Sequence, residues 1–165
     1  DYLTKAGTTI FLASIVLWFI LNFNMTGMVD NVSESFGASL GHLLVPVLEP
    51  AGLGMWQIAL ALICGISAKE VVVSSFSVLY EITNVNSAAG MSALAGILGL
   101  SGFGSLNALA LMVFCLLYVP CIATIATIKR ETGSWKWTLG MVLFQLGLAW
   151  VSAVLIYQVG GLFGL

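Results

Sequence analysis

Three long stretches of the chain contain no charged residue, and each is long enough to cross a membrane. They run from about 6 to 23, from 106 to 128 and from 138 to 159. Because an α-helix rises about 1.5 Å per residue, a stretch of about 20 apolar residues spans a hydrocarbon core of about 30 Å. The pattern therefore predicts three membrane-spanning helices, the second of them interrupted at Pro120.

A more polar segment follows the first stretch, and residues 31 to 44 within it have a helical pattern. Asn31 and Glu34 have the spacing of a capping box, and prolines at 46 and 50 mark the end. We expect a short helix lying in the membrane interface, with one apolar face formed by Val32, Phe36, Leu40, Leu43 and Leu44. Gly37 and Gly41 are spaced for close helix contact, but a small-residue face of a surface helix is the favoured interpretation.

Residues 52 to 82 form two apolar halves on either side of Lys69 and Glu70. Each half would be roughly 22 Å long as a helix, which is too short to cross alone. The pattern predicts either a re-entrant hairpin or one broken span, and irregular backbone at that depth must be buried in protein or must line a watery cavity. Lys69 and Glu70 are therefore candidates for a permeation path, with a structural ion pair as the alternative. Residues 83 to 104 are expected to be a loop with a short helix over 92 to 100.

The composition agrees with a membrane protein and limits its function. Of the 165 residues, 60% are hydrophobic and only 7% are charged, whereas about a quarter of the residues of a soluble domain are charged. Five basic residues are too few for a nucleic-acid surface, and there is no P-loop motif for a nucleotide. Because the chain begins with Asp1 rather than Met, we expect a fragment of a longer chain or a processed one.

The few basic residues predict the orientation in the membrane. Lys5 precedes the first predicted span, and the segment "KRETGSWKW" after the second contains Lys129, Arg130 and Lys136. Positive charges favour the cytoplasmic side, so we place both segments there and the C-terminus outside.

Pro120 and Cys121 are the residues of the second span most suggestive of chemistry. Proline has no N–H and its ring clashes with the carbonyl four residues earlier, so the carbonyl of Leu116 loses its helical partner. A neighbouring helix, an ordered water, the hydroxyl of Thr124 or Thr127, or a transported cation could replace that partner. A cysteine sulfur favours softer transition metals, so a freed carbonyl and a thiol together suit a borderline ion such as Fe²⁺. The alternative is a packing kink beside a small buried side chain.

Two quoted stretches carry a resemblance to a known family. "GISAKEVVVSSF" (65–76) and "LLYVPCIATIATIKRETGSWKWT" (116–138) resemble the C-terminal membrane region of the bacterial ferrous iron transport protein B family, and the likeness runs from Lys5 to about Gly160. The resemblance implies an all-α, polytopic helical bundle of the bacterial inner membrane, with residues 1–165 forming a single Gate-type domain that is nucleoside-transporter-like. It also implies a GTPase domain and a first Gate half outside this chain, so the chain itself is not expected to be an enzyme.

The resemblance also implies a set of site residues. The Pro-Cys motif falls on Pro120 and Cys121, and the Ala-Lys-Glu motif falls on residues 68 to 70. We expect Cys121 and Glu70 to contact the metal, and the transport path to include Ser67, Lys69, Leu116, Tyr118, Pro120 and Thr124. The roles of Cys64 and Cys115 stay open, and His42 is expected to be solvated, with external metal capture as the alternative.

The expected substrate is Fe²⁺, with no tightly bound cofactor and with GTP confined to the domain outside this chain. The expected partners are the lipid bilayer and the remaining domains of the parent chain, with a homo-oligomer or small accessory subunits left open. One alternative function is an assembly module that packs with partner subunits without conducting metal. A second, an intramembrane thiol enzyme using Cys121, is disfavoured because the predicted spans contain no histidine base.

Overall fold

The structure is a computed structural model that describes residues 2–66, 71–80, 82, 87–118 and 121–163. It is almost entirely helical, so the all-α membrane fold class is confirmed. The elements in order are α1 (Tyr2–Asn22), β1 (Phe23–Asn24), β2 (Gly27–Met28), the short 3₁₀ helix η1 (Val32–Glu34), α2 (Phe36–Leu48), the 3₁₀ helix η2 (Glu49–Ala51), α3 (Trp56–Gly65), α4 (Val71–Leu79), α5 (Ala88–Leu100), α6 (Ser105–Leu117), α7 (Ile122–Thr132) and α8 (Trp135–Phe163).

Two stretches of the described residues are long and apolar enough to cross a membrane. They are Ser105–Thr132, which combines α6 and α7, and α8. A helix pair, Phe36–Ala51 with Trp56–Gly65, is bent by 101° at its break and makes a third candidate if it is counted as one broken span. The first two stretches contain the residues of the second and third predicted spans, and α1 covers the first.

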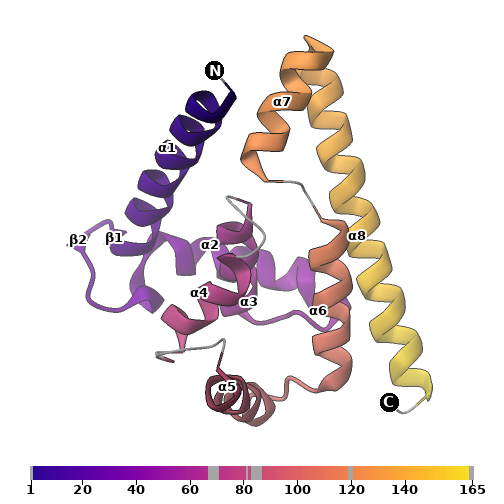
Figure 1. Ribbon diagram of the computed structural model, residues 1–165. Helices are drawn as coiled ribbons and strands as arrows, with labels where there is room; N and C mark the ends of the chain where they lie inside the picture. The colour runs from indigo at the N-terminus through magenta and orange to yellow at the C-terminus, as the bar shows by residue number, and fades with distance from the viewer. Residues whose placement is uncertain (1, 67–70, 81, 83–86, 119–120, 164–165) are drawn as a thin grey trace.

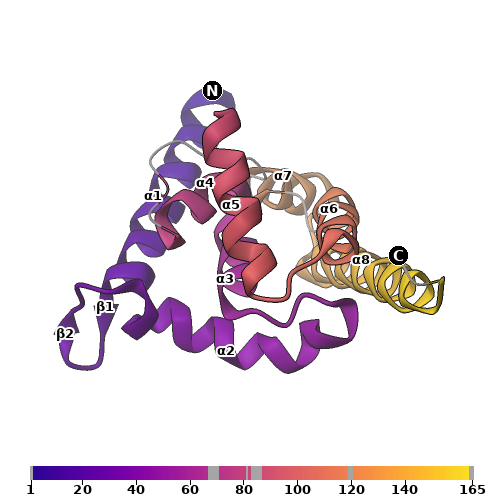
Figure 2. The ribbon, with the colours of Figure 1, turned by 90° about the horizontal axis from the view of Figure 1, so that it is seen from below.

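The two segments whose basic residues predict the orientation lie at one end of the molecule. The start of α1 and the junction of α7 with α8 lie at one end of the molecule, and the C-terminal end of α8 lies at the other (Figure 1). The segments that the charge pattern assigns to the cytoplasm therefore lie at the same end. Helices α2 and α5 run across the direction of α8, and the β1–β2 pair lies on the side of the molecule away from α8 (Figures 1 and 2).

Helix α2 begins later than the sequence predicts. Ser35 is its N-cap, because the Ser35 hydroxyl oxygen accepts a hydrogen bond of 3.2 Å from the backbone N–H of Ala38. Asn31 makes no side-chain cap bond and starts only the single turn η1, so the predicted capping box with Glu34 is wrong. Pro46 lies inside α2 rather than at its end.

The glycines of α2 face the protein. A Cβ atom added to Gly41 would lie 2.7 Å from the carbonyl oxygen of Trp56, and one added to Gly37 would lie 3.0 Å from a methyl group of Leu60. The interpretation of these glycines as the face of a surface helix is therefore wrong, since they let α2 and α3 approach closely. The three leucines of the predicted apolar face are exposed, with Leu43 at 71%, whereas its first two residues are half-buried.

Helix α5 is longer than the short helix expected over 92 to 100. Ser87 caps it, since its hydroxyl oxygen accepts a hydrogen bond of 3.0 Å from the N–H of Gly90. This cap starts the helix four residues earlier than the apolar pattern does. Most of the segment from 87 to 104 is thus helical rather than loop.

The sharp bend between α2 and α3 leaves backbone carbonyls without helical partners, and three side chains from α6 and α8 supply donors. The indole N–H of Trp150 donates to the Val47 carbonyl over 2.6 Å, and the amide of Gln158 donates to the Pro50 carbonyl over 3.2 Å. The amide of Asn107 donates to the Gly52 carbonyl over 2.7 Å. Unpaired carbonyls are costly in apolar surroundings, so these bonds fix the bend.

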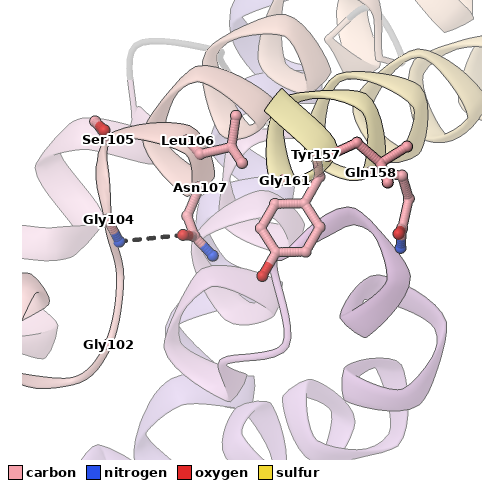
Figure 3. Close-up of a pocket in the computed structure, with 9 residues that line it drawn as sticks. Gly102, Gly104, Ser105, Leu106, Asn107, Tyr157, Gln158 and Gly161 are labelled. Carbon is pink, nitrogen blue, oxygen red and sulfur yellow. Dashed lines mark hydrogen bonds between the residues drawn. The ribbon is translucent and has the colours of Figure 1, made fainter. Parts of the chain in front are cut away.

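Figure 3 shows a pocket of about 430 Å³ that is lined by residues of α6, of α8 and of the loop before α6, among them two of the donors to this bend. Asn107 and Tyr157 approach it from α6 and α8, and the Asn107 side-chain oxygen also accepts from the N–H of Gly104 over 3.1 Å. Gly52 has a φ of +71°, and the Tyr157 ring occupies the space that a Cβ atom there would need. Glycine is therefore required at the start of the turn into α3.

We predict that Asn107→Ala destabilises the protein by about 1 to 3 kcal/mol, because it leaves the Gly52 carbonyl without its donor. Denaturant unfolding of the purified protein in detergent measures the change. The matched control is Asn22→Ala, whose amide bonds only to the Trp18 carbonyl one turn earlier in the same helix. Equal losses for the two variants would contradict the prediction.

Candidate functional site at two facing helix breaks

The break predicted at Pro120 separates two helices. Helix α6 ends at Leu117 and α7 begins at Ile122, with Tyr118 as the C-cap of the first and Cys121 as the N-cap of the second. The ψ angles of Tyr118 and Cys121 are 174° and 158°, so both residues have extended backbone. Pro120 itself lies outside the described residues.

A second break lies at the end of α3. This helix ends at Gly65 with Ile66 as its C-cap, and α4 begins at Val71. The residues between them include three that the sequence assigns to the site, Ser67, Lys69 and Glu70, and all three lie outside the described residues. The two short helices on either side of this segment match the two halves expected for the region 52–82.

The two breaks are hydrogen-bonded to each other. The backbone N–H of Ile122, the first residue of α7, donates to the carbonyl of Ile66 at the end of α3 over 2.9 Å. The first N–H groups and the last carbonyls of a helix have no partners within that helix. An N–H group at the start of α7 thus provides the hydrogen bond that a carbonyl at the end of α3 lacks within its own helix.

A second bond joins the breaks one helical turn away. The Tyr118 hydroxyl donates to the carbonyl of Leu62 over 3.4 Å, and Tyr118 is only 3% exposed. The space beside Gly65 is filled by this hydroxyl group and by a methyl group of Val72 on α4, so a Cβ atom at position 65 has no room. Gly65 is expected from the sequence only as a point where the two short halves meet, and its contact with Tyr118 was not predictable because Tyr118 is far away in the chain.

The other side of the α6–α7 break is more open. Cys121 is half-buried, and its sulfur lies 3.4 Å from the hydroxyl oxygen of Thr124, which is exposed. Leu116 is 74% exposed. Thr127, expected as a possible partner for the Leu116 carbonyl, donates instead to the carbonyl of Ala123 over 3.0 Å. The break therefore has an inner side at Tyr118 and an accessible side at Cys121.

The remaining candidate ligands lie apart from this arrangement. None of the three cysteines forms a disulfide; Cys64 is buried on α3 and Cys115 is half-buried on α6. His42 is exposed on α2, and its ring stacks on Trp56 with 5.6 Å between centroids. In the part of the chain that the structure describes, no three His, Cys, Asp or Glu side chains are grouped to hold a metal ion.

Two cavities adjoin the breaks, and they differ in chemistry. The larger, of about 550 Å³, is lined by apolar side chains of α2, α3, α6, α7 and α8, together with Tyr118 and Trp150. The smaller, of about 340 Å³, lies between α1, α3 and α4 and is lined partly by Cys64, Ser14, Ser74 and Ser75. The Cys64 thiol and the Ser75 hydroxyl are hydrogen-bonded. The smaller cavity therefore has more hydroxyl and thiol groups among its lining residues than the larger one.

Comparison with known proteins places the chain in a family. Residues 3–135 match the Gate family, which is described as nucleoside recognition. The chain belongs to the Gate family. No solved structure matches it.

The chain is also similar to proteins that are named as Fe(2+) transporters. It is 38% identical over 162 residues to "Fe(2+) transporter FeoB" of Staphylococcus aureus and 36% identical over 170 residues to the protein of the same name from Methanocaldococcus jannaschii. These matches cover 98% of the chain and 23% and 24% of the two relatives. A fusion protein from Porphyromonas gingivalis, "Fe(2+) transport protein A/Fe(2+) transporter FeoB fusion protein", is 32% identical over 204 residues, with 99% of the chain and 24% of the relative covered. The resemblance to the ferrous iron transport protein B family is confirmed, and the chain spans about a quarter of these relatives.

We predict that Ile122→Pro destabilises the protein by about 1 to 3 kcal/mol relative to Ile122→Ala, because only the proline removes the N–H that bonds to Ile66. Proline suits the first position of a helix, and the extended backbone of Cys121 suits the residue before a proline. Denaturant unfolding in detergent compares the two variants. Equal stability would show that the bond between the breaks contributes nothing.

Proposed function

We propose that this chain is the membrane part of a ferrous iron transporter and that Fe²⁺ passes the α6–α7 break on the side of Cys121. The relatives are named Fe(2+) transporters, and the match covers nearly the whole chain. The observation that carries the proposal is the bond between Ile122 and Ile66, because it brings two interrupted helices together beside the cysteine. Interrupted helices at membrane depth are typical of ion sites in transporters.

The donor atoms at the break suit a passing cation. The Cys121 sulfur and the Thr124 hydroxyl lie 3.4 Å apart, so one ion is able to contact both. A sulfur favours softer transition metals over Mg²⁺ and Ca²⁺. Conduction also requires a site that releases its ion, and two neutral or singly charged donors satisfy that requirement better than a complete ligand set.

The proposal includes residues next to the break in the sequence. Glu70 stands between Ile66, which bonds to α7, and Val72, which contacts Gly65. We assign Glu70 as the second metal ligand, with Ser67 and Lys69 beside it on the path. Pro120 and Leu116 form the α6–α7 side of that path, and Tyr118 supports it from the buried side of the break.

The rest of the parent protein supplies what this chain lacks. A GTPase domain and a first Gate half complete the transporter, and the chain takes part in transport without hydrolysing GTP. The chain's span of about a quarter of its relatives leaves ample length for both. The parent is placed in the bacterial inner membrane, with Fe²⁺ as substrate rather than as a resident cofactor.

We predict that Cys121→Ser in the full-length parent lowers anaerobic uptake of radioactive Fe²⁺ by about tenfold or more, because a ligand's loss costs at least as much as the loss of its supporting partner. Cys115→Ser is the matched control, since Cys115 lies six positions earlier on α6 and packs against the core. Membrane insertion of each variant is checked by immunoblotting.

Glu70→Gln is the second variant in the same uptake assay, and we expect a comparable loss. Wild-type uptake by both Cys121→Ser and Glu70→Gln, with normal insertion, would exclude this path. The break would then be a packing feature, and an assembly role for the chain would be favoured.

A further inference from the structure

We infer that the contact between Gly65 and Tyr118 positions Cys121, so that Tyr118 acts as a positioning residue and not as a ligand. This inference rests on the proposed function for its role in transport. The geometry that supports the inference does not depend on that function.

The inference starts from an irregularity at the end of α3. The N–H of Ile66 donates to the carbonyl of Ile63 over 3.2 Å, three residues earlier, instead of to the carbonyl of Leu62, four residues earlier. Such tightening is common in the last turn of a helix, and it leaves the carbonyl of the earlier residue without its usual donor. The Tyr118 hydroxyl donates to this carbonyl of Leu62.

The position of Tyr118 is also fixed by shape. Its hydroxyl group occupies the space beside Gly65 where any larger residue would place a Cβ atom, and Val72 closes the same space from α4. Both Tyr118 and Val72 are buried. Three elements, α3, α4 and the end of α6, therefore meet at the one residue on α3 that has no side chain.

Cys121 lies between two attachments to α3. On one side, Tyr118 bonds to Leu62; on the other, Ile122 bonds to Ile66. Leu62 and Ile66 are one helical turn apart, so both attachments are made to the same end of α3. The sulfur of the half-buried Cys121, which lies 3.4 Å from the Thr124 hydroxyl oxygen, is thus held at a set place by the bonds on either side of it.

Tyr118→Phe tests the inference because it removes only the hydroxyl group. In membranes containing the full-length parent, we expect Cys121 to react with N-ethylmaleimide about fivefold faster, as measured by mass spectrometry of the peptide that contains it. We also expect the KM for Fe²⁺ uptake to rise while the maximal rate changes less, as for a ligand that is present but poorly placed.

Tyr80→Phe is the matched control. The Tyr80 hydroxyl is buried and makes no hydrogen bond within the residues that the structure describes, so its removal should leave the reactivity of Cys121 unchanged. Equal alkylation rates in the two tyrosine variants would overturn the inference. A faster reaction in Tyr118→Phe, combined with wild-type uptake by Cys121→Ser, would support the positioning contact and reject the proposed function.

Gly65→Ala tests the same contact by adding a Cβ atom. We expect lower membrane yield, and partial recovery of that yield when Val72→Ala and Tyr118→Phe make room for the Cβ atom. Gly140→Ala is the control, because a Cβ atom at that position of α8 meets nothing within 4 Å. If Gly65→Ala behaves like Gly140→Ala, the steric part of the inference is wrong.

Discussion

The structure depends on the need to pair backbone groups at helix ends that lie in apolar surroundings. A continuous helix satisfies its own peptide groups, but each interruption exposes N–H or carbonyl groups that lipid cannot solvate. The chain meets this need with bonds between elements far apart in sequence, such as Ile122 to Ile66 and Asn107 to Gly52. The bond to Ile66 holds the end of α3, and the bond to Gly52 holds the turn that leads into its start. Helix α3 is thereby the fixed element against which α6, α7 and α8 are placed.

The bonds at both of its ends explain why α3, a short helix, occupies the centre of the fold. Buried residues run along almost all of α3, and the glycines of α2 bring a second backbone against it. The outer face of α8 is by contrast exposed and apolar, as expected for a helix in contact with lipid. The polar bonds specify position, while burial around α3 supplies most of the stabilisation.

Features set by local chemistry were predictable from the sequence, and features set by distant contacts were not. The interruption at Pro120 follows from the missing N–H of proline, and the long apolar stretches follow from composition. The predicted start of α2 was wrong because Asn31 and Ser35 are both good caps, and only the structure shows which one accepts the bond. For the site, the sequence pointed to Cys121, but not to Leu62, which lies 56 residues from its donor Tyr118.

The hydrogen bonds to α3 have one further consequence for how the chain tolerates change. Their acceptors are main-chain carbonyls, at Leu62 and Ile66 and at Gly52 just before the helix, which every amino acid carries. Two of their donors are the side chains of Tyr118 and Asn107, which few other residues replace. A substitution at an acceptor residue therefore leaves the hydrogen bond possible, whereas a substitution at Tyr118 or Asn107 removes it. These bonds therefore set no requirement on which side chain stands at position 62 or 66, whereas they require the side chains of Asn107 on α6 and of Tyr118 at its end.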